Sequence, residues 1–193
     1  MRIVYRQQCR RMKWKNGGGE TIELAISPKN STIENFGWRL SAAHVACDGP
    51  FSYFPGIDRS LVVTGGAGMM LAMPDRSCET LTPQTQPLIF PGEATIEAKL
   101  LGGPVDDLNV MTRRGRFRHH MAVQRTTHPV DVAGDAPLLI ASALDANADL
   151  EITGHRHVLR AGDFAIFDEN DAASLRIAPD RETLLYVIRL WPV

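Results

Sequence analysis

The stretch Val158-Leu-Arg-Ala-Gly-Asp-Phe-Ala-Ile-Phe167 places a Gly-Asp pair between two short apolar runs. Glycine enters the left-handed backbone conformation that tight turns require, at little steric cost. Short apolar runs bounded by such a turn are typical of β-strands. We therefore expect a strand, a turn and a second strand in this stretch.

A similar order of segments occurs earlier in the chain. Met70-Leu-Ala-Met73 is followed by Thr80-Leu81, and Phe90-Pro-Gly-Glu93 then places a second glycine-acid pair before the apolar-alternating run 94–100. In the second half, Leu150-Glu-Ile-Thr153 precedes the Gly-Asp stretch in the same way. Such an internal echo indicates a duplicated unit of hairpin, turn and strand.

Short apolar or alternating runs lie between turn signals along the whole chain, at 38–45, 60–63, 69–73, 94–101, 108–112, 138–144, 150–153, 158–159, 164–167, 173–177 and 183–190. No run keeps a helical period with capping residues at both ends. The 16 glycines and 12 prolines are spread through the chain, as many short elements joined by turns require. The sequence therefore predicts a mainly β fold with few short helices.

Composition excludes several classes of function. The 193 residues carry 21 Lys and Arg against 22 Asp and Glu, a net charge of -1 that argues against a nucleic-acid partner. No apolar run approaches the roughly 18 residues of a membrane span, so we expect no membrane partner. Cys9, Cys47 and Cys78 show no paired spacing, which predicts reduced thiols and a cytoplasmic protein.

The run Trp38-Arg-Leu-Ser-Ala-Ala-His-Val45 has a two-residue period. In a strand, Trp38 and Leu40 share one face, whereas Arg39 and Ser41 share the other. Arg39 and Ser41 either face solvent or face a sheltered interior. In the second case the buried guanidinium must be paired and offers two donors to a carboxylate.

The run Asp107-Leu-Asn-Val-Met-Thr112 follows the same pattern. Asp107 and Asn109 share one face, and a buried Asn needs hydrogen-bond partners. Asp107 is a candidate partner for Arg39, and Asn109 is a candidate contact for a ligand amide. Arg113, at the end of the run, is either part of an anion-binding rim or simply solvated.

Two loops complete the candidate site. Trp14-Lys-Asn-Gly-Gly-Gly-Glu-Thr21 lacks the order of a nucleotide-binding loop and predicts a structured turn, with a ligand-facing loop as the alternative. The segment 48–59 has two prolines, two glycines and three aromatic residues, which predict a rigid loop over a pocket mouth. Asn16, Ser52 and Arg59 are the polar residues that these loops would bring to a ligand.

The sequence resembles the HutD/Ves family of cupin-related bacterial proteins. The segments that carry the resemblance lie in the family's order at 14–21, 38–43, 48–59, 90–92 and 101–113. The Gly162-Asp163 turn also resembles one that recurs in cupin barrels. The resemblance implies a duplicated cupin-like double-stranded β-helix, a bicupin, with lobes at 1–112 and 113–193 packed as one compact unit.

The resemblance also implies a metal-free pocket that uses no cofactor and is built by the N-terminal motifs. His155 and His157 share a strand face, but no Glu follows at the spacing of metal-binding cupins and Arg160 stands close to its place. The implied role is accessory or regulatory in histidine or amino-acid catabolism. The implied ligand is a small anionic carboxylate, such as a formyl- or formimino-glutamate.

Our first hypothesis is therefore a small-molecule-binding protein. Its predicted ligand-binding residues are Arg39, Ser41, Asn109, Arg113, Asn16, Ser52 and Arg59. The alternative is a metal-free cupin enzyme of the isomerase or epimerase type, with His44 and Asp107 as the candidate pair. In a third interpretation the motifs serve packing alone. Exposed sheet edges favour a homodimer.

Overall fold

The computed structural model describes residues 1–169, 171 and 174–193, and the fold is mainly β, as predicted. Over these residues it contains 19 strands and one short 3-10 helix, η1 at Arg6–Gln8. None of the described segments forms a helix long and apolar enough to cross a membrane. The predicted strand 173–177 begins at a residue outside the described ones, and the observed strand covers Ser174–Pro179.

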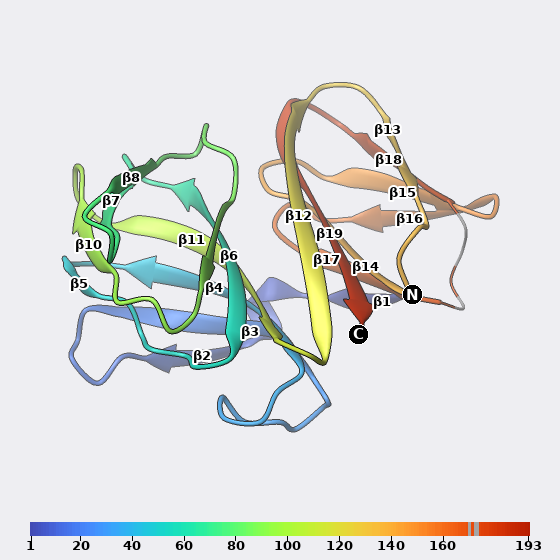
Figure 1. The fold of residues 1–193 in the computed structure, drawn as a ribbon. Helices are drawn as coiled ribbons and strands as arrows, with labels where there is room; N and C mark the ends of the chain where they lie inside the picture. The colour runs from blue at the N-terminus through green and yellow to red at the C-terminus, as the bar shows by residue number, and fades with distance from the viewer. Residues whose placement is uncertain (170, 172–173) are drawn as a thin grey trace. The chain divides into compact units, whose positions relative to one another are not determined.

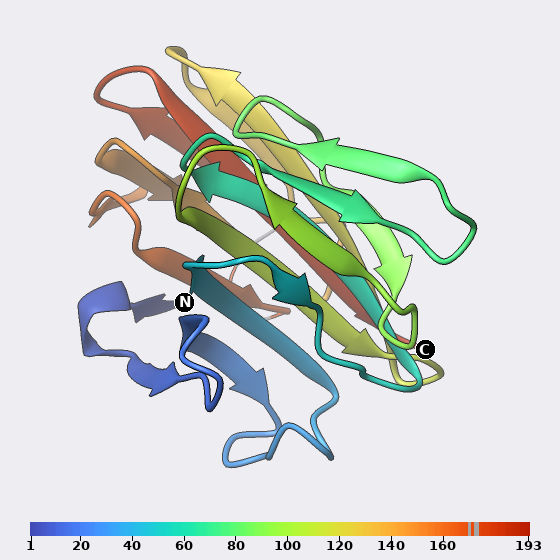
Figure 2. The ribbon, with the colours of Figure 1, turned by 90° about the vertical axis from the view of Figure 1, so that its left-hand side faces the viewer.

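The chain divides into two compact units, and the first unit comprises residues 9–118. It holds two sheets (Figure 1). The six-stranded sheet has the order β2 (Arg10–Lys13), β3 (Gly19–Ser27), β4 (Trp38–Val45), β11 (Val105–Arg113), β6 (Ile57–Gly65) and β9 (Leu88–Pro91). The four-stranded sheet has the order β5 (Gly49–Pro50), β10 (Glu97–Leu100), β7 (Met69–Ala72) and β8 (Cys78–Leu81). Between β3 and β4, residues 28–37 leave the sheet as a loop, light blue in Figure 2.

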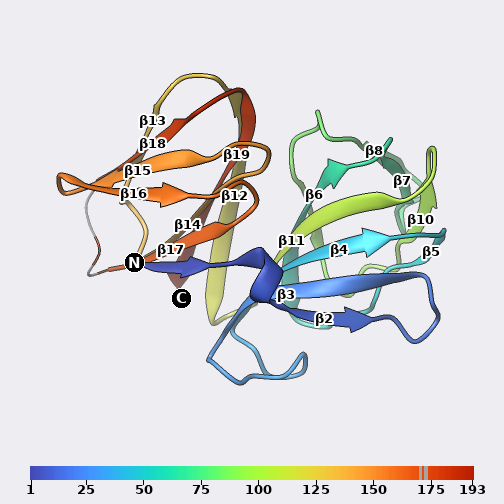
Figure 3. The same ribbon diagram turned by 180° about the vertical axis from the view of Figure 1, so that it is seen from behind.

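The second unit comprises residues 1–8 and 119–193. Its five-stranded sheet has the order β1 (Arg2–Val4), β17 (Phe164–Asp168), β14 (Leu138–Ala143), β19 (Thr183–Pro192) and β12 (Phe117–Thr126). Its four-stranded sheet has the order β13 (Val130–Ala133), β18 (Ser174–Pro179), β15 (Ala148–Ile152) and β16 (His155–Leu159). Figure 3 shows the N-terminal β1 beside β17. The expected division into 1–112 and 113–193 thus differs from the observed one, because β1 pairs with a C-terminal strand.

The strand order repeats along the chain. The order β4-β11-β6-β9 in the first unit corresponds to β12-β19-β14-β17 in the second, and β5-β10-β7-β8 corresponds to β13-β18-β15-β16. Every label in the second unit is eight higher. Among the described strands, each sheet keeps two edge strands, and the sheets do not close into a barrel.

The strand order corrects one detail of the predicted echo. Gly162-Asp163 lies between β16 and β17, whose counterparts are β8 and β9. The equivalent connection in the first unit is therefore 82–87, whereas Gly92-Glu93 comes after β9. The two glycines also serve different purposes. Gly162 has a φ of 77°, as the turn requires, whereas Gly92 allows a close backbone approach that is described below.

Each unit has its own apolar core. In the first unit, residues of β6, β7, β8, β9, β10 and β11 pack together, including Leu61, Met69 and Leu71, all with 0% exposure. In the second unit, Leu150, Leu159 and their neighbours form a larger cluster. The central strands β4, β11 and β6 bury side chains on both of their faces, so polar residues there must find partners.

Candidate functional site

A cavity of about 600 Å³ lies in the first unit and is lined from both of its sheets. Its volume is typical of a small-molecule site. Twenty-four residues line it, among them alternate residues of β4 and β11, Arg59 of β6 and parts of the loops at 14–18 and 47–54. Six of the seven predicted ligand-binding residues are in this lining: Asn16, Arg39, Ser41, Ser52, Arg59 and Asn109.

Arg39 is 5% exposed and faces the cavity, so of the two predicted orientations the sheltered one is correct. Its Nε donates a hydrogen bond to Glu23 Oε2 at 3.0 Å, and its Nη1 donates to Ser41 Oγ at 3.2 Å. Nη1 also lies 3.9 Å from the Met111 sulfur. The guanidinium is therefore held in one orientation with its charge balanced by Glu23.

Glu23 was not among the predicted site residues, and the expected pairing of Arg39 with Asp107 is not formed. Glu23 lies on β3, next to β4, where the register shifts between Glu23 and Ala25. The sequence holds a signal for this pair, since an acid in the strand before Arg39 is a natural cross-strand partner. The register shift hides it, because a bulge changes which residues oppose each other.

Arg59 is 4% exposed and is surrounded by aromatic rings. Its Cζ lies 4.8 Å from the Phe90 centroid, 5.3 Å from that of Phe51 and 5.5 Å from that of Phe54. Nη1 donates to the Ser52 carbonyl oxygen at 3.4 Å, and Nε is buried without a hydrogen-bond partner. Cation-π contacts stabilise a charge without neutralising it.

The charge on Arg59 persists at neutral pH. Burial lowers the pKa of its guanidinium to about 10, an effect that Asp107 opposes and Arg39 increases. Within the described part of the chain, no carboxylate oxygen lies within 4.0 Å of Arg59. Arg59 therefore presents to the cavity a positive charge that no direct ion pair among the described residues neutralises, which suits an anion.

Asp107 is 4% exposed and lines the same cavity from β11. Burial raises the pKa of its carboxyl to about 7, with Arg59 opposing this effect and Asp106 adding to it. Asn109 is 8% exposed, and its Oδ1 is buried with no hydrogen-bond partner. The cavity thus contains acceptor groups as well as the two guanidinium groups.

The sheet register orders these groups into rows. Met111 is opposite Arg39 on one side and Arg59 on the other, so one row holds both arginines. In the next row along the same face, Asn109 is opposite Ser41. Asp107 lies two residues further along β11. One end of this wall is therefore cationic and the other end carries hydrogen-bond acceptors.

The two predicted loops adopt defined structures. Gly17 has a φ of 72°, and the Gly18 backbone N–H donates to Asn16 Oδ1 at 3.0 Å, so residues 14–18 form the structured turn. Trp14 Nε1 donates to Thr21 Oγ1 at 2.8 Å. Because Trp14 and Asn16 also line the cavity, the turn is a part of its wall.

Gly92 fixes the loop at 48–57. Its carbonyl oxygen accepts a hydrogen bond from Phe54 N at 2.8 Å, and its N–H donates to the Ile57 carbonyl oxygen at 2.6 Å. A Cβ at this position would lie 2.5 Å from the Phe54 carbonyl oxygen. The Phe90-Pro-Gly92 motif therefore needs a glycine to place the loop, and with it the Phe54 ring near Arg59.

Arg113 is not part of the cavity lining, unlike the other predicted residues. Its Nε donates to the Phe36 carbonyl oxygen at 2.9 Å, and its Nη2 donates to the Glu34 carbonyl oxygen at 2.7 Å. It also lies 5.5 Å from the Phe36 ring centroid. Since Arg113 follows Thr112 at the strand end, it holds the loop at 28–37 instead of forming an anion rim.

The candidate acid-base pair of His44 and Asp107 does not form. His44 Nδ1 lies 2.8 Å from Asp106 Oδ1, and both side chains are about half exposed. His44 is opposite Asp106 in the register of β4 and β11, so Asp107 points to the other face of the sheet. Strand alternation therefore separates the two members of the predicted pair.

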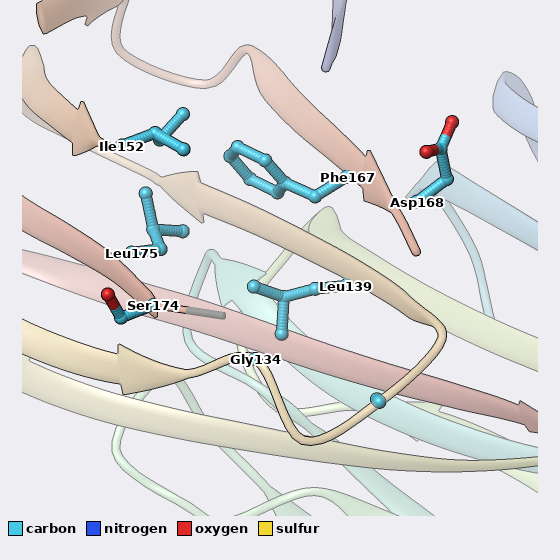
Figure 4. A pocket seen from close by; sticks show the side chains of 8 residues that line it. Gly134, Leu139, Ile152, Phe167, Asp168, Ser174 and Leu175 are labelled. Carbon is cyan, nitrogen blue, oxygen red and sulfur yellow. The ribbon is translucent and has the colours of Figure 1, made fainter. Parts of the chain in front are cut away.

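The second unit offers a much smaller hollow of about 20 Å³. Figure 4 shows Leu139, Ile152, Phe167 and Leu175 converging on it, with Ser174 nearby. This volume holds about one water molecule. His155 and His157 lie on β16 as exposed residues, and no three His, Cys, Asp or Glu side chains of the described residues form a metal-binding group.

Comparison with known proteins confirms the predicted resemblance. The HutD family model matches residues 6–185. A 21.2 kDa protein from the hutC 3′ region of Pseudomonas putida is 32% identical over 162 residues, which are 84% of this chain and 83% of that protein. Protein Ves from Citrobacter koseri is 37% identical over 115 residues, 59% of each chain.

Solved structures of similar proteins have the same fold. A conserved protein from Pseudomonas aeruginosa PAO1 is 28% identical with a TM-score of 0.90, over 98% of both chains. HutD from Pseudomonas fluorescens SBW25 is 26% identical with a TM-score of 0.83, over 100% of this chain and 98% of that one. A cupin 2 barrel-domain protein from Leptotrichia buccalis is 9% identical with a TM-score of 0.61, over 93% and 95%, and so identifies the fold as cupin-like.

Proposed function

The chain belongs to the HutD family, and on that premise we propose that it binds a small carboxylate-bearing metabolite in the 600 Å³ cavity. The observation that carries this proposal is Arg59, a buried guanidinium in the cavity wall with no ion-pair partner among the described residues. Arg39 lies across Met111 in the same row and supplies a second guanidinium. A carboxylate in the cavity would pair with the Arg59 guanidinium.

We propose that this binding serves an accessory or regulatory role in histidine breakdown, in the cytoplasm. The relative from Pseudomonas putida is described by its position next to hutC, which supports the connection. Formyl- and formimino-glutamate have the size and charge that the cavity can accept. Urocanate also carries a carboxylate, but its shape differs from that of the two glutamate derivatives.

Calorimetric titration of the purified protein with histidine, urocanate and the two glutamate derivatives tests the proposal. We expect at least one carboxylate to bind, and Arg59→Ala or Arg39→Ala to weaken it by tenfold or more, because each loses a charge-assisted hydrogen bond. Arg114→Gln is the matched control, since Arg114 forms exposed pairs with Asp58 and Glu93 away from the cavity. Absence of binding by all four compounds would contradict the proposal.

A second candidate function is an isomerase or epimerase, and Asp107 is the observation that favours it. A cavity-lining carboxyl with a pKa near 7 is suited to proton transfer. Incubating a bound chiral ligand with the protein in deuterated water, followed by NMR, tests this function. Exchange of a carbon-bound proton that Asp107→Asn abolishes supports it, and a ligand recovered without deuterium contradicts it.

We further propose that the two units arose by duplication of one cupin-like unit, giving a bicupin. The shared strand order, offset by eight strands, supports this origin. The added strands, β2 and β3 in the first unit and β1 in the second, lie outside the repeated order. A search for single-unit proteins with the order β4-β11-β6-β9 tests the idea.

A further inference from the structure

A thiol lies in the wall of the cavity and has no part in the proposed function. Of the three cysteines, all of them within the described residues, Cys47 alone lines the cavity. It follows β4 and continues the alternation of cavity-facing residues that begins at Arg39. Cys47 is also exposed to solvent, so a small reagent can reach it.

Hydrogen bonds on both sides hold the backbone at Cys47 in place. The Ala46 N–H donates to the Gly18 carbonyl oxygen at 2.8 Å, and the Leu100 N–H donates to Asp48 Oδ1 at 2.8 Å. The sulfur lies against the turn that contains Gly18, because a Cβ on this glycine would be 2.9 Å from Sγ. The absence of a side chain on Gly18 therefore leaves room for the thiol beside a part of the cavity wall.

The charges around the cavity favour an anionic reagent. Lys13 and Lys15 flank Trp14 in the turn against which the sulfur lies, and both line the cavity. The other charged side chains of the lining are those of Arg39, Arg59, Asp48 and Asp107. Glu23 offsets the charge of Arg39, so positive charge remains in excess. A cleft lined mainly by one sign of charge raises the local concentration of ions of the opposite sign.

An independent observation indicates that the cavity accepts a polar guest. Asn109 is 8% exposed and lines the cavity, yet its side chain forms no hydrogen bond with a described residue. Buried polar side chains in folded proteins normally have a partner, from the protein, from water or from a ligand. A polar group attached to Cys47 would therefore enter a space that already contains charged and hydrogen-bonding groups.

We infer that Cys47 is a modification site for small disulfides that carry carboxylates, such as glutathione disulfide, and that the attached group occupies the cavity. The Cys47 thiolate attacks one sulfur of the disulfide and forms a new S–S bond, while the S–S bond of the reagent breaks and its other half leaves as a thiolate. The thiol proton passes to solvent, and an added thiol reverses the step. Only the consequence for a metabolite, which the attached group would exclude, rests on the proposed function.

Three small disulfides of different charge test the site. Dithiodiglycolate is anionic, hydroxyethyl disulfide is neutral and cystamine is cationic. Peptide mass spectrometry at about pH 8 and low ionic strength would measure the rate at which each reagent modifies Cys47 and Cys78, since a fraction of thiols is then ionised. Cys78 is the control within the same molecule, because it is an exposed free thiol on the edge strand β8, outside the cavity lining.

We expect the ratio of the anionic rate to the cationic rate to be about tenfold or more higher at Cys47 than at Cys78. The neutral reagent should give an intermediate rate at Cys47. Added salt should reduce the difference between the two sites, because salt screens charges that solvent can reach. Equal ratios at the two cysteines overturn the inference.

Charge-neutralising variants locate the source of the preference. Lys13→Gln combined with Lys15→Gln should lower the ratio at Cys47 by about threefold or more. Lys29→Gln combined with Lys99→Gln is the matched control, because it removes the same charge from exposed positions outside the lining and should leave the ratio nearly unchanged. A ratio that both pairs lower equally, or that neither pair lowers, overturns the inference.

NMR of the methionine methyl groups tests whether the attached group enters the cavity. Met12 and Met111 line the cavity, whereas Met70 does not. Glutathione attached to Cys47 in the Cys78→Ser protein should shift the methyl resonance of Met12 or Met111 and leave that of Met70 in place. Glutathione attached to Cys78 in the Cys47→Ser protein should shift neither cavity methionine.

The two proposals fail separately. If glutathione on Cys47 leaves both cavity methionines unshifted, the attached group lies outside the cavity and the inference is overturned, whereas the proposed function stands. If the disulfides select Cys47 and shift a cavity methionine but no metabolite binds in calorimetry, the proposed function is overturned and this inference is supported.

Discussion

The two units share one strand order, but the first encloses a polar cavity and the second has an apolar core. In the first unit, β11 turns Asp107 and Asn109 toward a cavity of about 600 Å³. In the second unit, the corresponding strand β19 turns Leu185 and Val187 into the apolar core, which contains a hollow of about 20 Å³. The comparison teaches that the backbone arrangement allows either interior, and that side chains on a few central strands decide between a pocket and a packed core.

The largest change in the free energy of unfolding is expected when an acidic side chain is placed in the apolar core of the second unit. Leu185 is 1% exposed, and Leu185→Asp should lower the free energy of unfolding by about 4 kcal/mol or more, because it buries an unpaired charge. The reciprocal change Asp107→Leu in the first unit should leave stability unchanged or raise it at pH 8. Urea denaturation measures both. A cost below about 1 kcal/mol for Leu185→Asp would remove the distinction between the two interiors.

The second prediction concerns how the buried carboxyl of Asp107 makes the free energy of unfolding depend on pH. The pKa of Asp107 is raised to about 7 in the folded state, above its unfolded value near 3.9, so its ionisation opposes folding. The free energy of unfolding is therefore highest below about pH 3.9. It falls by at most about 4 kcal/mol as the pH rises through 7. Asp107→Asn should therefore be more stable than wild type at pH 8, with an advantage that shrinks toward pH 4.

Denaturation at a series of pH values between 4 and 8 measures this difference. Asp106→Asn serves as the control, because Asp106 is about half exposed. An advantage of Asp107→Asn that does not vary with pH would show that the buried carboxyl is not the cause.

A smaller loss of stability is expected when the loop that holds the aromatic rings around Arg59 is disturbed. Gly92→Ala would place a methyl group 2.5 Å from the Phe54 carbonyl oxygen, so backbone must move. We expect a loss of about 1 to 3 kcal/mol in stability, together with weaker carboxylate binding. Gly65→Ala is the control, since its Cβ meets only the flexible Asp106 side chain at 3.2 Å. Unchanged binding by a folded Gly92→Ala protein would separate the loop from the site.

The smallest effect is expected at the exposed pair of His44 and Asp106. His44→Gln should change the free energy of unfolding by no more than about 1 kcal/mol and leave ligand binding unchanged, because polar contacts between exposed side chains contribute little. Thermal unfolding and calorimetry measure the two quantities. Loss of ligand binding in this variant would show that His44 contributes to the site, although it lies on the strand face that points away from the cavity.

Much of the site follows from periodicity alone. The two-residue period of 38–45 and 107–112 predicts that Arg39 and Ser41 share one face and that Asp107 and Asn109 share another. The structure turns both faces to the same cavity. The partners were not predictable in the same way, because Glu23 reaches Arg39 through a register shift in β3 and Arg113 is used by the carbonyl groups of a neighbouring loop.

The mainly β fold and the strand faces that carry the polar residues are encoded locally in the amino-acid sequence, since alternation along a strand is a local property of the backbone. Three features depend on the folded arrangement instead: three phenylalanines surround Arg59, Gly92 makes room for Phe54, and Asp107 is buried in a cavity wall. These features depend on contacts between segments distant in the chain. Their energies come from burial and packing, which no local pattern contains.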